Sequence, residues 1–236
     1  MRHPLSIKSQ SRSWAPVGAA LVAGVAAAVV VCLFGTGARA GSQDFFDHLH
    51  RRIAAAEAQR KTVRARFTET TTSSLLAKPV VRHGTLVASK PDRIVITYAP
   101  PEPKTIVMRG VQLFVIRPNL PEKDRVETID ITEIMKKVNH YFTNASPDEL
   151  RRAFTIRAFP DPDASGASQI QLLPKRKQIK QGLEHLQIWV SPDDMLAQLQ
   201  LTFAGGDTET FKLEGIELNI PIPPSAFDVS TAQGKK

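Results

Sequence analysis

Six histidines are the side chains that could most readily bind a metal ion or transfer a proton, and they are His3, His48, His50, His83, His140 and His185. His48 and His50 are the closest pair, but on a helix they would point in different directions and could not share a metal ion. The chain has no cysteine after residue 40, so a zinc site would need scattered histidines and carboxylates. The sequence therefore predicts no metal site.

Short motifs that carry catalytic chemistry are missing from the chain. Asp161–Gly166 begins like a calcium-binding loop, but Leu172 stands where that loop needs glutamate, and Pro162 interrupts the run of ligands. No G-x-S-x-G motif, glycine-rich phosphate loop or H-E-x-x-H motif occurs, and Ser73 and Ser74 have no base that the sequence identifies. We therefore expect a turn at residues 161–166, no cofactor, and a protein that is not an enzyme.

The first 40 residues have the three parts of a signal peptide. A basic start without acidic residues precedes the uncharged run Val17–Phe34, and Ala38–Ala40 supplies the small-residue cleavage site. The apolar run is also just long enough to span a bilayer, so an uncleaved membrane anchor is the alternative. Cleavage after Ala40 would leave a protein that works outside the cytoplasm.

Removal of the leader changes the charge of the working protein. Residues 1–40 hold four of the 31 Lys and Arg residues and none of the 23 Asp and Glu residues, so the rest has a net charge of +4 rather than +8. This modest charge argues against nucleic-acid binding. The remaining length suits one domain, residues 41–231, which can bury a core without disulfides. Residues 232–236 form a polar tail.

Hydrophobic periodicity along this domain predicts both helices and strands. A helix is predicted at Gln43–Lys61, where apolar residues recur at steps of three and four. Two more are predicted, at Ile131–Phe142 and from Ser146 to about Ala153, the latter because a capping serine, a proline and two acidic residues begin it. Alternating segments between turn residues predict strands at Thr62–Ser73, Val80–Ser89, Asp92–Tyr98, Thr105–Met108, Val111–Arg117, Arg125–Ile129, Gln169–Leu173, Leu183–Val190, Ala197–Phe203, Thr208–Leu213 and Ile216–Ile220.

These elements predict a mainly β (α+β) fold. About ten short strands separated by turns favour an antiparallel sheet. A sheet of that size curls, and its concave apolar face has to be covered. The three helices are the cover that the sequence offers, and they would enclose a core or a cavity.

Several short motifs follow one another in a characteristic order. They are Arg66–Glu69, Gly84–Leu86, Lys90–Arg93, Tyr98–Pro101, Ile106–Gly110, and Asn219–Pro221 with Phe227. This order resembles the LolA-like outer-membrane lipoprotein carriers. In that family a Phe-x-Gln/Glu strand is followed by a Gly-x-Leu strand, an (Arg/Lys)-Pro turn, an aromatic-x-x-Pro end and an Ile-Val-x-x-Gly hairpin. The resemblance covers nearly all of the chain after the leader.

The resemblance implies a fold and a function. The fold would be an unclosed antiparallel β-barrel with helices that lid an apolar cavity. The protein would be a monomeric periplasmic carrier, which shields the acyl chains of a lipoprotein or lipid between the inner and outer membranes. An inner-membrane ABC-type transporter would load it, and an outer-membrane acceptor would unload it.

The predicted ligand-binding residues are apolar and share strand or helix faces. Two come from the first helix, eight from strands, and three form the lid; the alternative for each is ordinary core packing, which patterning cannot separate from cavity lining. They are Leu49, Ile53, Val63, Ala65, Phe67, Leu86, Ala88, Ile94, Ile96, Tyr98, Ile134, Met135 and Val138.

Charged residues are predicted at two further places. The family often has arginine before the proline of its turn, where it bonds to the lid helices; here Lys90 takes that place and would make a looser latch. Lys175, Arg176, Lys177 and Lys180 form a basic cluster, which is either a solvated loop or a docking patch for an acidic partner or anionic lipid head groups.

Two other functions remain open from the sequence. Leu75–Val80 looks more like divergent LolA-like proteins associated with other lipids or lipid-like pigments, so the cargo could be a lipid that is not attached to protein. The same barrel also serves as a lipid-sensing regulatory module that binds a membrane partner.

Overall fold

The computed structural model describes residues 45–138, 146–163 and 166–232. The predicted signal peptide and the end of the polar tail lie outside these described residues. None of the helices in the described ranges is long and apolar enough to cross a membrane.

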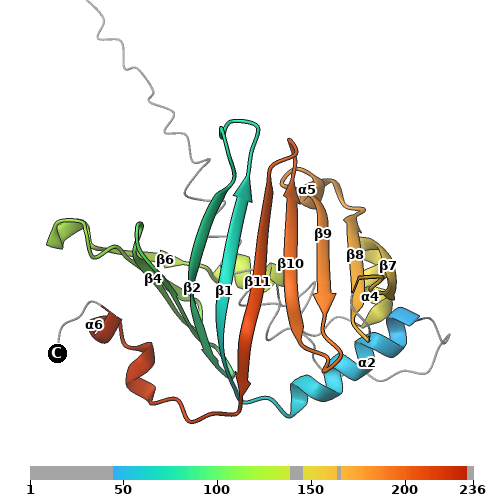
Figure 1. Cartoon of the computed structure of the whole chain (residues 1–236), viewed down its shortest axis with the longest axis horizontal. Helices are drawn as coiled ribbons and strands as arrows, with labels where there is room; N and C mark the ends of the chain where they lie inside the picture. The colour runs from blue at the N-terminus through green and yellow to red at the C-terminus, as the bar shows by residue number, and fades with distance from the viewer. Residues whose placement is uncertain (1–44, 139–145, 164–165, 233–236) are drawn as a thin grey trace, which may run out of the picture.

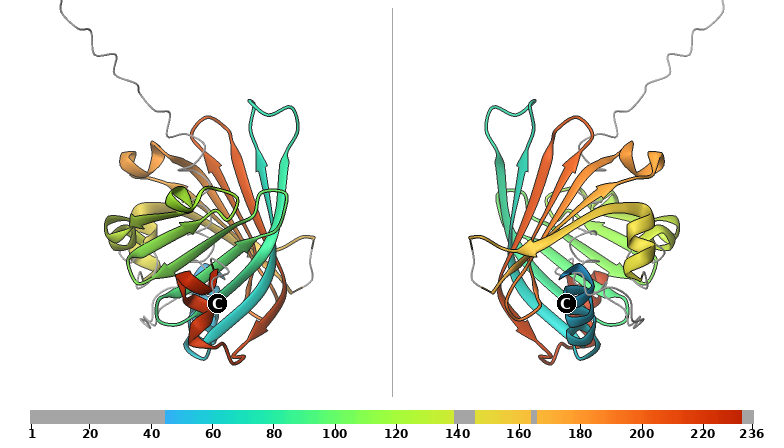
Figure 2. Two further views of the ribbon diagram at one scale, coloured as in Figure 1. Left: turned by 90° about the vertical axis from the view of Figure 1, so that its left-hand side faces the viewer. Right: turned by 90° about the vertical axis from the view of Figure 1, so that its right-hand side faces the viewer.

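The core of the protein is a single antiparallel sheet of 11 strands in the order β6-β5-β4-β3-β2-β1-β11-β10-β9-β8-β7 (Figure 1). It curls around its concave face without closing, since β6 and β7 remain edge strands (Figure 2). This confirms the predicted unclosed antiparallel barrel. The strands are β1 (Thr62–Thr72), β2 (Val80–Ser89), β3 (Arg93–Tyr98), β4 (Lys104–Arg109), β5 (Gln112–Ile116), β6 (Val126–Asp130), β7 (Phe154–Pro160), β8 (Ser168–Pro174), β9 (Leu183–Val190), β10 (Leu196–Phe203) and β11 (Thr208–Leu218).

Alternation of side chains explains why these segments form strands. In β1, Val63, Ala65 and Phe67 are buried, whereas Arg64 and Arg66 are exposed. Each neighbouring pair of strands joins consecutive segments except β1 and β11, which lie at opposite ends of the domain sequence. The β1–β11 pair therefore joins the two halves of the sheet.

The helices flank the sheet. Their bounds are α2 (Phe45–Ala58), α3 (Thr132–Val138), α4 (Pro147–Ala153), α5 (Lys177–Lys180) and α6 (Val229–Ala232), with 3-10 turns η1 (Glu122–Asp124) and η3 (Pro224–Phe227). The capping serine predicted for α4 is confirmed, and it forms a capping box: the Ser146 hydroxyl accepts from the Glu149 main-chain N–H, and the Glu149 side chain accepts from the Ser146 N–H. At the lower end of the sheet in Figure 1, α2 buries Phe46, Leu49 and Ile53 against the strands.

A second, smaller apolar cluster covers the outer face of β3–β5. Val95, Val107 and Ile116 are buried there, and Phe227 of η3 packs against them. The chain after Pro221 therefore returns across the convex side of the sheet, and β3 is buried on both faces only around Val95.

Two strands differ from the sequence prediction. The helix α4 ends at Ala153 as predicted, but β7 follows it directly, with no glycine, proline or other turn residue to mark its start, and the sequence prediction assigned no strand there. β11 is one strand rather than two, because Gly215 (φ 59°) makes a bulge opposite Ala65 and the ladder continues on both sides.

Gly84 is expected to be indispensable for the packing of β2. A Cβ at this position would overlap the Thr97 carbonyl oxygen and the ring of Phe67. We expect Gly84→Ala to lower the free energy of unfolding by about 2–3 kcal/mol, measured by urea denaturation. Gly182→Ala is the matched control, because nothing lies within 4 Å of its added Cβ; equal losses in both variants would contradict the prediction.

Candidate functional site

The concave face of the sheet carries the residues predicted to bind ligand. All ten such residues from α2 and the strands are buried, and they belong to one continuous apolar cluster with the inner faces of β4, β5 and β8–β11. They are Leu49, Ile53, Val63, Ala65, Phe67, Leu86, Ala88, Ile94, Ile96 and Tyr98. The structure thus brings them together in one cluster on the concave side of the sheet, whether they line a ligand cavity or fill a core.

The predicted lid is only partly within the described residues. Met135 on α3 is half-buried and packs against the apolar cluster. Ile134 and Val138 lie on the same helix, but their side chains are outside the described part of the structure, as are residues 139–142 of the predicted segment. In the chain, α3 directly follows β6, which is one of the two edge strands of the sheet.

Three aromatic rings occupy the apolar face near the upper end of the sheet. Phe67 packs edge-on to Tyr98 with ring centroids 5.1 Å apart, and tilted against Phe211 at 6.2 Å. Aromatic pairs in these arrangements add to the stability that burial alone confers. We call these three rings the aromatic floor, because a row of polar side chains lies next to them on the same face of the sheet.

The polar row crosses neighbouring strands at the upper end of the concave face, opposite α2. Glu69 of β1 is completely buried, and one of its oxygens accepts a hydrogen bond from the Tyr98 hydroxyl at 2.5 Å. Its other oxygen lies 3.3 Å from Nη1 of Arg82 on β2, whose Nε and Nη2 donate to Glu102. Burial and the Glu69 carboxylate raise the pKa of Tyr98, so the phenol keeps its proton and donates a hydrogen bond to Glu69.

A second buried carboxyl stands beside Glu69. Glu209 of β11 is 2% exposed, and the β1–β11 register places it diagonally across from Glu69 on the same face. Burial and the neighbouring Glu69 carboxylate raise the pKa of Glu209 to about 8. Oε1 of Glu209 has no hydrogen-bond partner among the described residues.

Lys104 of β4 completes the row. Its ammonium lies 4.0 Å from the centroid of the Tyr98 ring, and burial lowers its pKa. Sequence analysis missed the polar row. The sequence did contain one signal, the alternation of side chains along a strand. Glu69 is two positions from Phe67, and Glu209 is two positions from Phe211, so each acid lies on the same face as an apolar residue.

Lys90 contacts α2. Its ammonium donates to the main-chain oxygen of Glu57 at 2.5 Å and lies 3.2 Å from the Glu57 carboxylate. Arg60 binds the same carboxylate at 2.7 Å and donates to the main-chain oxygens of Asp193 and Asp194. Cations near a helix C-terminus are favourable, so these bonds fasten the end of α2 to the β2–β3 and β9–β10 turns. The family latch was expected at the lid helices; the described partner is α2.

Loss of the Lys90 ammonium should loosen the end of α2. We expect Lys90→Met to lower the free energy of unfolding by about 1 kcal/mol, because the pair is partly exposed and Arg60 still neutralises Glu57. Hydrogen exchange should speed up in the last turn of α2 more than in α3, and Lys90→Arg should retain most of the protection. Faster exchange confined to α3 would show that Lys90 acts on the lid instead.

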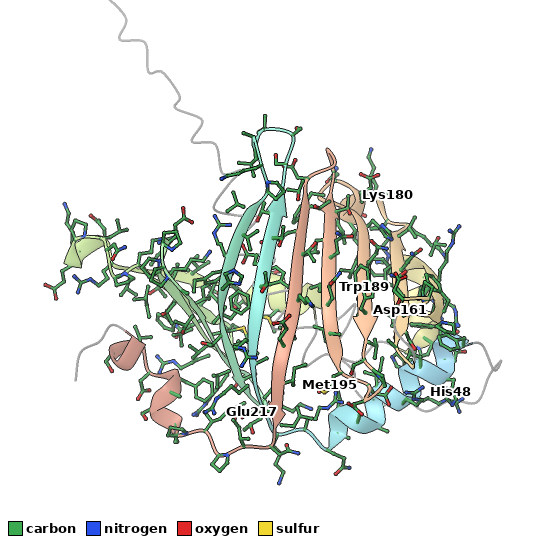
Figure 3. The ribbon with its side chains drawn as sticks, viewed as in Figure 1. His48, Asp161, Lys180, Trp189, Met195 and Glu217 are labelled. Carbon is green, nitrogen blue, oxygen red and sulfur yellow. The ribbon has the colours of Figure 1, made fainter. Side chains whose placement is uncertain are left out.

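Part of the predicted docking cluster lines a surface groove near the upper end of the sheet. Lys175 and Lys180 border a hollow of about 690 Å³ together with Thr155, Leu173, Glu184 and Gly205. Thr155 and Leu173 are a cross-strand pair exposed on the outside of the sheet, so the groove lies outside the apolar core. Arg176 and Lys177 adjoin it at the start of α5, and Figure 3 shows Lys180 pointing away from the sheet.

Comparisons with known proteins find several solved structures of low similarity. A search of curated proteins finds no significant match. Similar solved structures include LppX, a lipoprotein of Mycobacterium tuberculosis (13% identity, 77% of this chain, 99% of that chain, TM-score 0.47). A LolA superfamily protein of Nitrosomonas europaea (10%, 73% and 92%, TM-score 0.38) and the MucA/MucB complex of Pseudomonas aeruginosa (11%, 79% and 61%, TM-score 0.46) are others.

The family model described as outer membrane lipoprotein carrier protein LolA matches residues 58–230. This range includes all 11 strands and the end of α2. The match confirms the resemblance inferred from the motifs, and the chain belongs to the LolA family.

Proposed function

We propose that the protein is a periplasmic carrier that shields the acyl chains of a lipoprotein or lipid between the inner and outer membranes. The observation that carries the proposal is the continuous apolar concave face of an unclosed sheet, covered by α2 and α3, in a member of the LolA family. The residues that would contact acyl chains are the predicted set on α2, β1–β3 and α3. No catalytic step is required for this role.

The energetics of transfer explain why such a face is useful. Each methylene group removed from water stabilises a lipid by about 0.8 kcal/mol, so a lipid with long acyl chains does not cross an aqueous compartment unaided. The carrier must also release its cargo. A cover that can pack either on the sheet or on the lipid meets both needs, because it exchanges one buried apolar contact for another.

Identification of lipid that co-purifies with the protein is the direct test. The protein would be expressed with its leader, purified from the periplasm under mild conditions, and analysed by mass spectrometry. Acylated peptide would support lipoprotein transport, and free lipid or pigment would support a carrier of other lipids. Protein that is empty and binds an inner-membrane regulator would favour a sensing module. Failure to bind any lipid or apolar probe would overturn the proposal.

The surface groove bordered by Lys175 and Lys180, which we call the basic groove, is the proposed docking surface for an acidic partner or anionic lipid head groups. In the carrier role, the partners would be an inner-membrane ABC-type transporter and an outer-membrane acceptor. We expect Lys175→Glu/Lys180→Glu to weaken binding to vesicles of anionic lipid, or to the transporter, by about tenfold at low salt. Lys61→Glu/Lys212→Glu makes the same change in net charge at exposed sites away from the groove. Equal weakening by both pairs would mean that overall charge, not the groove, controls binding.

A further inference from the structure

The polar row is unusual because it lies on the inner face that is otherwise apolar. Glu69 and Glu209 are 0% and 2% exposed, and they meet across the β1–β11 pair that joins the two halves of the sheet. Below them the same strands bury Phe67, Phe211 and Leu213. Two carboxyl groups in this position call for an explanation, because an apolar side chain of similar volume would be buried at no such cost.

The hydrogen bonds of the row leave one acceptor unused. Glu69 is occupied by Tyr98 on one oxygen and by Arg82 on the other. Glu209 lies beside Glu69, and its Oε1 has no hydrogen-bond partner within the described ranges. A buried acceptor without a partner costs about 1–3 kcal/mol, so this oxygen is poised to accept a hydrogen bond from a bound molecule.

The surroundings select the chemistry of that molecule. Arg82 and Lys104 already place two cationic groups beside the row, and they would repel a third cation. Glu209 holds its proton at neutral pH and would present a neutral carbonyl-type acceptor to the ligand. An anionic head group would be repelled by the Glu69 carboxylate. An uncharged donor, a hydroxyl or an amide N–H, is the group that fits without these penalties.

We propose that Glu209 accepts a hydrogen bond from an uncharged hydroxyl or amide group at the polar end of the apolar cargo. The aromatic floor of Phe67, Tyr98 and Phe211 would pack against the first methylenes, and the remaining chain would extend along the concave face toward α2. The row would orient the cargo with its polar end at the upper end of the sheet. This assignment rests on the proposed carrier function, because it requires an apolar ligand on that face.

Two isomeric ligands separate the hydrogen bond from apolar contact. Decanol and methyl nonyl ether have the same atoms, but only decanol has a hydrogen-bond donor. Their binding to the purified protein would be measured by displacement of an apolar fluorescent probe at pH 7. We expect decanol to bind about five- to tenfold more tightly than the ether.

Variants of Glu209 test whether this residue produces the preference. Glu209→Met should abolish the difference between the two ligands. Glu209→Gln keeps a carbonyl acceptor and should retain it, and Glu217→Met is the matched control, because Glu217 lies exposed at the other end of β11 (Figure 3). Thermal unfolding of each variant would verify that it folds.

The outcomes distinguish this inference from the carrier function. If neither ligand displaces the probe, the apolar face does not bind lipid and the carrier proposal fails as well. If both bind with equal affinity to the unchanged protein, the carrier proposal stands and the role of Glu209 is overturned. A preference for decanol that survives in Glu209→Met would also overturn it.

Discussion

Glu209→Gln is expected to make the protein more stable than the unchanged chain above pH 8, by an amount on the order of a few kcal/mol. Glutamine has nearly the same shape and does not ionise. In the unchanged chain, the carboxyl group must lose its proton in a buried site beside the Glu69 carboxylate as the pH rises. Arg82 and Lys104 offset only part of that cost, because each already has an acidic or aromatic neighbour.

The sign of the pH dependence follows from whether Glu209 binds its proton more tightly in the folded or in the unfolded protein. Its pKa is about 8 in the folded protein and near the ordinary value of 4.5 when unfolded, so between these values the folded state holds more protons. The free energy of unfolding therefore falls as the pH rises through this range. The contribution of the protonated Glu209 carboxyl group to the free energy of unfolding is complete below pH 4.5 and is lost as the pH rises past 8.

Urea denaturation of both proteins between pH 5 and pH 9 measures this effect. The two curves should lie close together at pH 5, separate progressively as the pH rises toward 8 and run parallel above it, with Glu209→Gln the more stable. Because the same substitution is expected to keep the preference for decanol, stability and ligand recognition can be assessed in one variant. Parallel curves throughout the range would mean that Glu209 is not the group that titrates.

Ile94→Glu is expected to abolish binding of an apolar probe and to lower the free energy of unfolding by several kcal/mol. Ile94 is 3% exposed on the concave face, where it faces Ala88 of β2 and Met108 of β4. A carboxyl group there is removed from water without a partner, so it either disrupts packing or takes up a proton. Either result removes the continuous apolar surface on which acyl chains would lie.

The matched control for this variant is on the same strand. Thr97 is exposed, so Thr97→Glu introduces the same charge on the other side of β3. Binding of the probe and circular dichroism would be measured for both variants at pH 7, and for Ile94→Glu again at pH 5, where protonation should restore part of the stability. Ile94→Glu that folds and binds the probe as tightly as Thr97→Glu would show that the concave face is not the lipid site.

Local patterns in the sequence were sufficient for most elements of the fold. The Ser146 capping box depends on residues within one turn, and alternation along β1 depends on neighbours two positions apart, so both are visible without a structure. The strand β7 was missed because no turn residue separates it from α4. The bulge at Gly215 was interpreted as a break, since a glycine within a strand pattern indicates either one.

The candidate site shows the limit of such patterns more clearly. Alternation placed Phe67, Ile94 and Tyr98 on buried faces, and the structure brings them into one cluster. Alternation alone could also have assigned Glu69 to that face, but an acid near the end of a strand is usually exposed to water, and its burial depends on what covers it. The partner of Lys90 was equally undetermined, because a flexible ammonium bonds whichever oxygen the fold brings near.

The sequence by itself determined that the chain alternates as an antiparallel sheet, has a signal-like leader, and carries the motif order of the LolA family, because each of these is written in residues close together along the chain. Only the tertiary structure decided that β1 pairs with β11 and that Glu69 therefore lies next to Glu209 in a buried site. The two acids are far apart in sequence, and no local preference encodes their contact. It arises from the pairing of β1 with β11, which joins the two halves of the sheet. That pairing places a buried acceptor, without a partner among the described residues, on a face otherwise suited to lipid.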